Sequence, residues 1–184
     1  MQTVSVVLQL SKGDTVNVYR PNPVRLMDYY DDKKTQFIGW LLKSSEPGII
    51  FDGVSNHNYK TSGTITYSSA YENVGNGLNV ANGVFTAPTS GIYYFHFEGL
   101  PDFGDANLIN LKLNGEIIAS SFRHVQQAFI NHIYSGTGTG LQTISAIRRL
   151  AKGDKVNVFN SYGKLRDNQT HRYTQFIGWL LMKE

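Results

Sequence analysis

One strand in the middle of the chain limits the possible folds more than any other feature. Residues 92–97, Ile-Tyr-Tyr-Phe-His-Phe, alternate two rows of side chains, and both rows are largely apolar or aromatic. Pro88 and Gly91 indicate a turn directly before this strand, because proline fixes φ and glycine accepts positive φ. An antiparallel sheet usually wets one of its faces, so this strand is predicted to have neighbours on both.

Short strands separated by turn residues account for most of the remaining sequence. Asn114-Gly115 is a favoured two-residue hairpin turn, and no segment is predicted to be an amphipathic helix. Ten strands are expected, at residues 49–54, 64–71, 84–86, 92–97, 108–113, 117–121, 122–134, 143–150, 155–158 and 176–181. Short strands at this spacing predict an all-β antiparallel sandwich.

Length and composition narrow the class of protein further. The 184 residues are enough for one domain or slightly more, and only 17% of them are charged. The net charge of +3 is spread along the chain and forms no basic stripe, which argues against a nucleic-acid partner. The chain has no cysteine, so disulfides and thiolate chemistry are excluded. No stretch approaches the roughly 20 apolar residues of a membrane span.

Eight positions around the central strand carry a family resemblance. Their spacing matches the signature of the globular-head domain of complement C1q: Tyr67, Asn73, Leu78, Phe85, Gly91, Tyr93, Phe95 and Phe97. The chain therefore resembles the C1q and tumour necrosis factor-like family over residues 47–184. Tyr67 is the one departure, since the family usually has Phe there, and its hydroxyl needs a partner if buried. The resemblance implies a ten-stranded jelly-roll sandwich, trimer formation and an extracellular, secreted protein.

The end of this domain is repeated at the start of the chain. Residues 2–18 align without gaps on residues 142–158, and residues 35–42 are identical to residues 174–181. We therefore expect residues 1–42 to be the last three strands of a preceding C1q-like domain. Residues 43–48 are predicted to be a linker, and residues 49–184 the complete domain.

Three strands taken from a jelly roll cannot bury their own apolar faces, so residues 1–42 need a host. In one interpretation the chain is part of a tandem protein whose upstream portion is missing. In the other, the segment completes a sheet in a neighbouring molecule. The first residues carry no signal-peptide pattern, so secretion would require either a removed signal or a longer parent chain.

The closing strand, residues 176–181, is also apolar on both faces. One face must line the core, and the other would expose a hydrophobic strip of the kind that marks an interface, unless a loop of the same chain covers it. The pattern alone predicts some partner, and the resemblance implies a homotrimer or a higher assembly of this chain. The residues expected at the subunit interface are Tyr94, His96, Ile177, Trp179 and Leu181.

Arg148 interrupts an otherwise apolar row. Leu8 occupies its place in the first repeat, whereas the second repeat has arginine between Ala146 and Leu150. An unpaired buried charge is costly, so Arg148 is expected to meet an acid, a group of carbonyls near a symmetry axis, or water. It is predicted either to be a satisfied polar residue at a subunit boundary or to contact an anionic ligand.

No catalytic constellation is recognisable, so the protein is not expected to be an enzyme. The five histidines have no zinc-ligand spacing, and the serines form no nucleophile elbow. The one candidate cofactor is calcium, for which Asp102 and Asp105 beside Gly104 offer hard oxygen ligands. A plain solvated loop is the alternative for these two carboxylates.

A loop near the end of the chain combines aromatic, amide and guanidinium groups. This composition suits a carbohydrate, but protein interfaces use the same residues, so a protein ligand stays open. The candidate ligand-binding residues are Tyr162, Arg166, His171 and Tyr173. Asn168-Gln-Thr170 also matches the acceptor pattern for N-glycosylation.

Two functions follow from these observations. The first is a trimeric binding protein that recognises glycans or other surface ligands, in an innate-immune or lectin-like role. The second is an assembly module of an extracellular matrix or polymer, in which residues 1–42 link the units. The sequence contains no collagen-like Gly-x-y repeat, which argues against a complement-like effector role.

Overall fold

The computed structural model describes residues 8, 10–17, 48–124, 127–130, 133–136, 140–168 and 170–184. Every regular element in these residues is a strand. None of the described residues forms a helix long and apolar enough to cross a membrane. The chain divides into two compact units, Leu8–Ser45 and the remainder, and most of the first unit lies outside the described residues.

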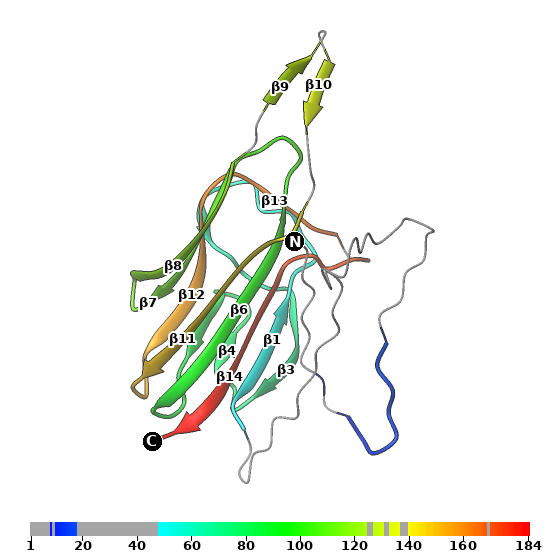
Figure 1. The fold of residues 1–184 in the computed structure, drawn as a ribbon. Helices are drawn as coiled ribbons and strands as arrows, with labels where there is room; N and C mark the ends of the chain where they lie inside the picture. Colours follow the sequence, from blue (N-terminus) through cyan, green and yellow to red (C-terminus); the bar gives the residue numbers. More distant parts are fainter. Residues whose placement is uncertain are drawn as a thin grey trace, which may run out of the picture. The chain divides into compact units, whose positions relative to one another are not determined.

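The central strand β6 belongs to the first of two antiparallel sheets. Figure 1 shows β6 between β11 and β14, with β1 and β3 beyond β14. The order is β11 (Gln142–Leu150), β6 (Gly91–Pro101), β14 (Gln175–Lys183), β1 (Ile50–Val54) and β3 (Ser69–Val74), and β13 (Leu165–Arg166) also pairs with β6. Neighbours in the sheet are distant in sequence, as expected for a jelly roll.

The second sheet packs its apolar side against the first. Its order is β4 (Leu78–Asn79), β5 (Val84–Thr86), β12 (Lys155–Tyr162), β7 (Asn107–Leu113) and β8 (Glu116–Arg123), and β2 (Gly63–Thr64) pairs with β12. A separate hairpin consists of β9 (Gln127–Ile130) and β10 (Ile133–Gly136). The predicted all-β sandwich is therefore confirmed.

Aromatic rings fill the space between the sheets. Tyr93, Phe95 and Phe97 of β6 are fully buried, as the apolar pattern of this strand predicts. Phe51 of β1 lies 4.8 Å from Phe85 of the second sheet, measured between ring centroids. Each such aromatic pair contributes about 0.5–1.5 kcal/mol beyond the burial of its surface.

Two of the signature residues close a turn. The side-chain amide of Asn73 donates to Leu78 O at 2.9 Å, and Leu78 N donates to Asn73 Oδ1 at 3.1 Å. Between them, Gly75 and Asn76 have positive φ values of 85° and 51°. The expected turn at Asn114-Gly115 is also confirmed, with φ values of 51° and 92°.

The expected number of strands is too small. The described residues contain fourteen strand segments, because two predicted strand regions each contain two strands and two segments of two residues were not anticipated. The prediction for residues 64–71 was wrong because Ile65 N and Tyr67 N donate to two different partners, Val158 O and Val80 O, outside a continuous ladder. The predicted strand region at residues 122–134 contains the end of β8, which stops at Arg123, and the two hairpin strands β9 and β10.

The first repeat is described only around one turn. Asp14 N donates to Ser11 O at 3.1 Å, and Ser11 N donates to Asp14 Oδ2 at 2.7 Å. Asp154 forms the same pair of bonds with Ala151, at 3.1 and 2.8 Å. The aligned turns therefore share one geometry, although residues 10–17 contain no strand. Linker residues 43–47 and the other predicted strands of residues 1–42 lie outside the described residues.

Candidate functional site

One row of apolar side chains crosses the face of the first sheet that points away from the core. Cross-strand register aligns these residues from β11 to β3: Ile147, Tyr94, Trp179, Ile50 and Val74. We call this row the apolar band. Directly opposite residues in a ladder share a face, so the register alone places all five together. The two end residues, Ile147 and Val74, are 55% and 38% exposed.

Four of the five predicted interface residues lie on this outer face. Tyr94 and His96 pair with Trp179 and Ile177, and none of the four belongs to the core cluster. Trp179 and Ile177 are nevertheless buried within the chain. Sequence alternation fails at Leu181 because a β-bulge separates Leu180 from Met182 in their pairing with β6.

The bulge puts Met182, rather than Leu181, in register with Ile92. Leu181 and Met182 are both exposed, at 47% and 61%. They extend the exposed apolar surface toward the end of β14. Alternation along a single strand could not reveal this extension, because the bulge adds one residue to the strand.

Polar side chains lie next to the apolar band on the same outer face, toward the N-terminal end of β14. His96 and Glu98 of β6 are both buried, and His96 Nδ1 lies 2.8 Å from Ser145 Oγ. His96 Nε2 lies 3.8 Å from Glu98 Oε2, and neither of these two atoms has a hydrogen-bond partner among the described residues. Further along, Gln175 donates to Asp52 Oδ1 at 2.6 Å. The outer face thus combines an apolar band with a buried polar region.

The predicted ligand-binding loop is held by a buried carboxylate. Asp167 is 5% exposed and accepts hydrogen bonds from the backbone nitrogens of Asn168, Tyr173 and Thr174, at 2.7–2.9 Å. The rings of His171 and Tyr173 stack with centroids 5.4 Å apart. Both rings therefore lie on a loop whose backbone is hydrogen-bonded to Asp167.

The other two predicted ligand contacts lie outside this stacked pair. Tyr162, at the end of β12, is 58% exposed, and Arg166 is exposed in β13. Within the described residues, no hydrogen bond or ring contact joins either of them to the stacked rings. The structure instead places Arg172 over the ring of Tyr71, 5.0 Å from its centroid, which the sequence pattern did not reveal. Because Arg172 and Tyr71 are far apart in the sequence, no local motif predicts their contact.

Asn168 has the accessibility that the predicted glycosylation requires. Its side chain is exposed, and its Oδ1 accepts a hydrogen bond from Thr170 N at 2.9 Å. This tight turn brings the amide and the threonine of the acceptor pattern close together. Glycosylation of Asn168 stays a prediction.

The two proposed calcium ligands already have other partners. Asp102 Oδ1 accepts from Phe103 N at 2.9 Å, and Asp105 lies 3.5 Å from the ammonium of Lys164. Calcium usually takes six to eight oxygen ligands, and a neighbouring ammonium would oppose its charge. The described residues contain no group of three or more acidic or histidine side chains that could hold a metal. A calcium site here would need further ligands and stays a prediction.

Arg148 ties the two sheets together at their open edge. Its guanidinium donates to Ile118 O of β8 and to Ile147 O of its own strand, both at 2.8 Å. Gln142, at the other end of β11, donates to Ser121 O of β8 at 2.5 Å. The observed partners of Arg148 are therefore carbonyl groups of its own chain, and its role at a subunit boundary or with an anionic ligand stays a prediction.

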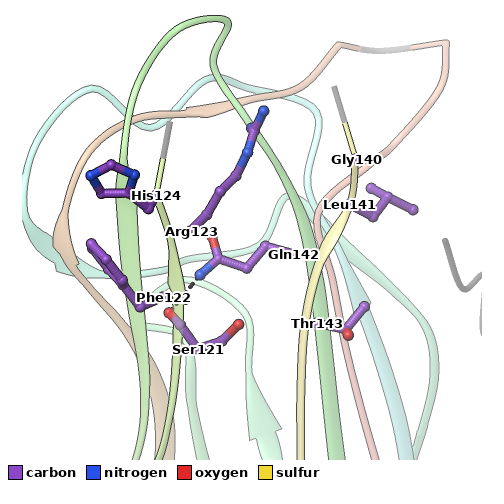
Figure 2. A pocket seen from close by; sticks show the side chains of 8 residues that line it. All are labelled: Ser121, Phe122, Arg123, His124, Gly140, Leu141, Gln142 and Thr143. Carbon is purple, nitrogen blue, oxygen red and sulfur yellow. Dashed lines mark hydrogen bonds between the residues drawn. The ribbon is translucent and has the colours of Figure 1, made fainter. Parts of the chain in front are cut away.

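A pocket opens beside Gln142, and the sequence analysis did not identify it. Figure 2 shows the Gln142 amide between the strand that carries Ser121 and the strand that carries Thr143. The lining residues are Ser121, Phe122, Arg123, His124, Gly140, Leu141, Gln142 and Thr143. The pocket combines the ends of β8 and β11, which are neighbours only after the two sheets have packed.

Comparison with known proteins identifies the family of the described sandwich. Residues 51–181 match the family model of the C1q domain. The human and mouse proteins named Complement C1q tumor necrosis factor-related protein 3 are each 28% identical to this chain over 131 residues. The aligned region is 71% of this chain and 49% of each relative. The chain thus spans about half the length of the curated relatives it matches.

Solved structures agree with the jelly-roll fold. The globular domain of zebrafish Complement 1qA protein superposes with a TM-score of 0.57 at 17% identity, over 74% of this chain and 99% of that domain. Murine APRIL at pH 5.0 gives a TM-score of 0.51 at 14% identity, with the same two coverages. At these identities the likeness shows the fold alone.

Proposed function

This chain belongs to the C1q domain family, and we propose that it is a non-enzymatic recognition protein that acts as a trimer outside the cell. The apolar band carries the proposal. An antiparallel sheet normally presents polar side chains to water, whereas here one complete row across five strands is apolar. Apolar surface that continues across a sheet usually marks an interface.

Two further copies of this chain are the proposed occupants of the outer face. A partner subunit would cover the exposed ends of the apolar band together with the exposed Leu181 and Met182. The buried His96 and Glu98 would then lie beside the contact and favour one arrangement of subunits over others. Because every subunit offers the same face, three copies can close a ring around one axis.

The ligand of this trimer is proposed to be a glycan or another surface molecule. The stacked His171 and Tyr173 and the exposed Tyr162 and Arg166 are the proposed contacts. Three such sites on one rigid assembly multiply weak individual contacts through avidity. Secretion is proposed from the family, since the relatives are named as complement-related proteins.

Two measurements test this function. Sedimentation equilibrium of the 184-residue chain should give three times its mass of 20.6 kDa, and a single-chain mass at micromolar concentration would contradict the trimer. Binding to an array of glycans and microbial surfaces, with calcium and with a chelator, tests recognition. We expect saturable binding that falls when Tyr162 and Arg166 are replaced by alanine. Loss of binding in the chelator alone would show that recognition needs calcium, for which Asp102 and Asp105 are the proposed ligands.

A second function, that of an assembly module, is favoured by the repeated turn. Ser11 and Asp14 form the same hydrogen bonds as Ala151 and Asp154, and Leu8, Leu10 and Val16 are 40–53% exposed. Apolar strand sequence left exposed can complete a sheet in another molecule. In that case, the full chain should form concentration-dependent polymers, and residues 45–184 should not. Identical discrete trimers from both would contradict strand exchange.

A further inference from the structure

Two aromatic rings and a leucine form a row on the outer face of the second sheet. In β7 and β12 the core side is marked by residues such as Ile109 and Val158, which are fully buried. Leu108 precedes Ile109, so it points away from the core, because successive side chains of a strand alternate. The register aligns Leu108 with Tyr162 of β12 and with Phe122 of β8. We call these three residues the aromatic row.

A β-bulge brings Tyr162 into this row. Alternation from the buried Val158 and Asn160 would turn Tyr162 toward the core. The register of β12 with β7 shifts between Asn160 and Tyr162, which adds one residue and puts Tyr162 opposite Leu108. Bulges re-aim side chains in this way, and Tyr162 is accordingly 58% exposed.

The two rings at the ends of the row are open to solvent. Phe122 is 60% exposed, and Leu108 is partly buried between it and Tyr162. β12, β7 and β8 are consecutive in the second sheet (Figure 1). Neighbouring strands lie about 4.8 Å apart, so the residues that carry the rings are separated by about 10 Å. An open row of this length suits an extended ligand better than a single small molecule.

The next row along the same face holds two hydroxyl groups in place. Asn110 is 3% exposed and lies in register between Phe159 and Ser120. Its Nδ2 donates to Ser161 Oγ at 2.6 Å, and its Oδ1 accepts from Ser120 Oγ at 2.7 Å. The buried amide is thus satisfied and orients both serine hydroxyls. A ligand lying along the aromatic row would find them beside it.

This face offers little charge to a partner. Lys112 Nζ lies 3.7 Å from the centroid of the Phe159 ring, so its charge is directed onto that ring. No carboxylate occurs in the three rows that pass through Leu108, Asn110 and Lys112. Their members are Tyr162, Leu108, Phe122, Thr64, Phe159, Asn110, Ser120, Val84, Asn157, Lys112 and Ile117. An uncharged partner rich in hydroxyl groups matches this face better than a polyanion or a polycation.

We propose that the aromatic row binds an extended, uncharged β-1,4-linked polysaccharide. Successive sugars of such a chain are turned over relative to each other, and every second sugar is about as far from the first as Phe122 is from Tyr162. The C–H faces of two sugars would pack on these rings, with the sugar between them on Leu108. Burial of this apolar surface favours binding. The inference rests on the proposed recognition function, names a ligand class for it and adds Phe122 to its contacts.

The test compares two glucose hexasaccharides that differ only in linkage. Calorimetric titration of the full chain should give saturable binding of cellohexaose, whose β-1,4 links keep it straight. Maltohexaose, whose α-1,4 links coil it, should bind at least about tenfold more weakly, because it cannot reach both rings. Phe122→Ala should weaken cellohexaose binding about tenfold, as expected for loss of a large aromatic contact. The matched control is Phe103→Ala, since Phe103 is 59% exposed on another loop, and it should leave binding unchanged.

A measurement on the unaltered chain keeps the test independent of folding defects. Cellohexaose should shift the methyl resonances of Leu108 and leave those of Ile147, in the apolar band of the other sheet, in place. Circular dichroism and sedimentation equilibrium check that each variant is folded and keeps the mass of the parent assembly. If Phe122→Ala changes that mass, the row is a contact between copies of this chain and the proposal is overturned.

Three binding results would also overturn the proposal: no saturable binding of cellohexaose by the folded chain, equal binding of both hexasaccharides, or binding that Phe122→Ala leaves intact. If the surface array stays positive in any of these cases, recognition survives and only the aromatic row fails. A blank array together with no cellohexaose binding would overturn both.

Discussion

Tyr94 and Trp179 face each other across β6 and β14, with ring centroids 4.4 Å apart and ring planes inclined at 36°. The same register puts Ile147 beside Tyr94 and Ile50 beside Trp179. This contact lies on the opposite side of the sheet from the aromatic core. The sheet is therefore apolar on both faces, which is the property that a subunit interface requires.

Replacing Gly178 by alanine should destabilise the domain. A methyl group there would lie 2.5 Å from Phe51 Cε1 and 3.0 Å from Phe95 Cδ1, and both rings are fully buried. Overpacking of this kind costs about 1–3 kcal/mol of the free energy of unfolding. Urea denaturation at fixed protein concentration measures the loss. Gly140→Ala is the control, since the added methyl would have no heavy atom within 4 Å, and an equal loss in both variants would contradict the packing argument.

Tyr67→Phe should leave stability unchanged or raise it by about 1 kcal/mol, because it removes a hydroxyl that is buried without a partner. The hydroxyl of Tyr67 has no hydrogen bond among the described residues, although a partner was expected for it. Tyr59→Phe provides the contrast, since the Tyr59 hydroxyl donates to Thr66 O and also forms a hydrogen bond with the hydroxyl of Ser55. That variant should lose about 1 kcal/mol. Thermal denaturation compares the two, and a larger loss for Tyr67→Phe would contradict the assignment.

Alkaline pH should destabilise the domain through ionisation of Tyr59. Burial raises the pKa of Tyr59 from 10.0 to about 12. A folded-state pKa above the unfolded value contributes stability below pH 10 that is lost as pH rises toward 12. Tyr59→Phe should therefore show a shallower fall in urea midpoint over this interval than the parent chain. Parallel curves would show that Tyr59 does not contribute to the alkaline loss.

Acid should weaken the turn at Asp154. Hydrogen bonds from Asn114 Nδ2 and from Ala151 N lower the pKa of the Asp154 carboxyl below its ordinary value of 3.8. A lowered pKa contributes stability that is present above pH 3.8 and lost as pH falls through the folded-state value. The advantage of the parent chain over Asp154→Asn should thus be constant above about pH 5 and shrink below pH 3.8. If the stability advantage of the parent chain over Asp154→Asn grows as the pH falls, the prediction is contradicted.

The core could be predicted from sequence because its signals are local. Alternation places Tyr93, Phe95 and Phe97 in one row, and all three are fully buried. Residues 64–71 alternate in the same way, and Ile65 and Tyr67 are indeed buried in the core cluster. They do not form a continuous strand, because their backbone donors reach different partners. Apolar alternation therefore predicted burial correctly and hydrogen bonding incorrectly.

The candidate sites depend on contacts that a single strand cannot reveal. The apolar band requires the register of four strand pairs, and Val74 belongs to it only through Ile50. The pocket requires Gln142 of one sheet to meet Ser121 of the other. Arg148 was recognised as unusual from sequence, but its carbonyl partner on Ile118 follows only from the packing of the sheets.

The most direct test of the proposed trimer compares two isoleucines by sedimentation equilibrium. Ile147 and Ile117 are 55% and 56% exposed, but Ile147 lies in the apolar band and Ile117 lies in β8 of the other sheet. Ile147→Lys should convert a three-chain assembly into folded single chains, because it places charge in the subunit contact. Ile117→Lys should remain a three-chain assembly. If Ile147→Lys keeps the mass of the parent assembly, the outer face of the first sheet is not the subunit interface.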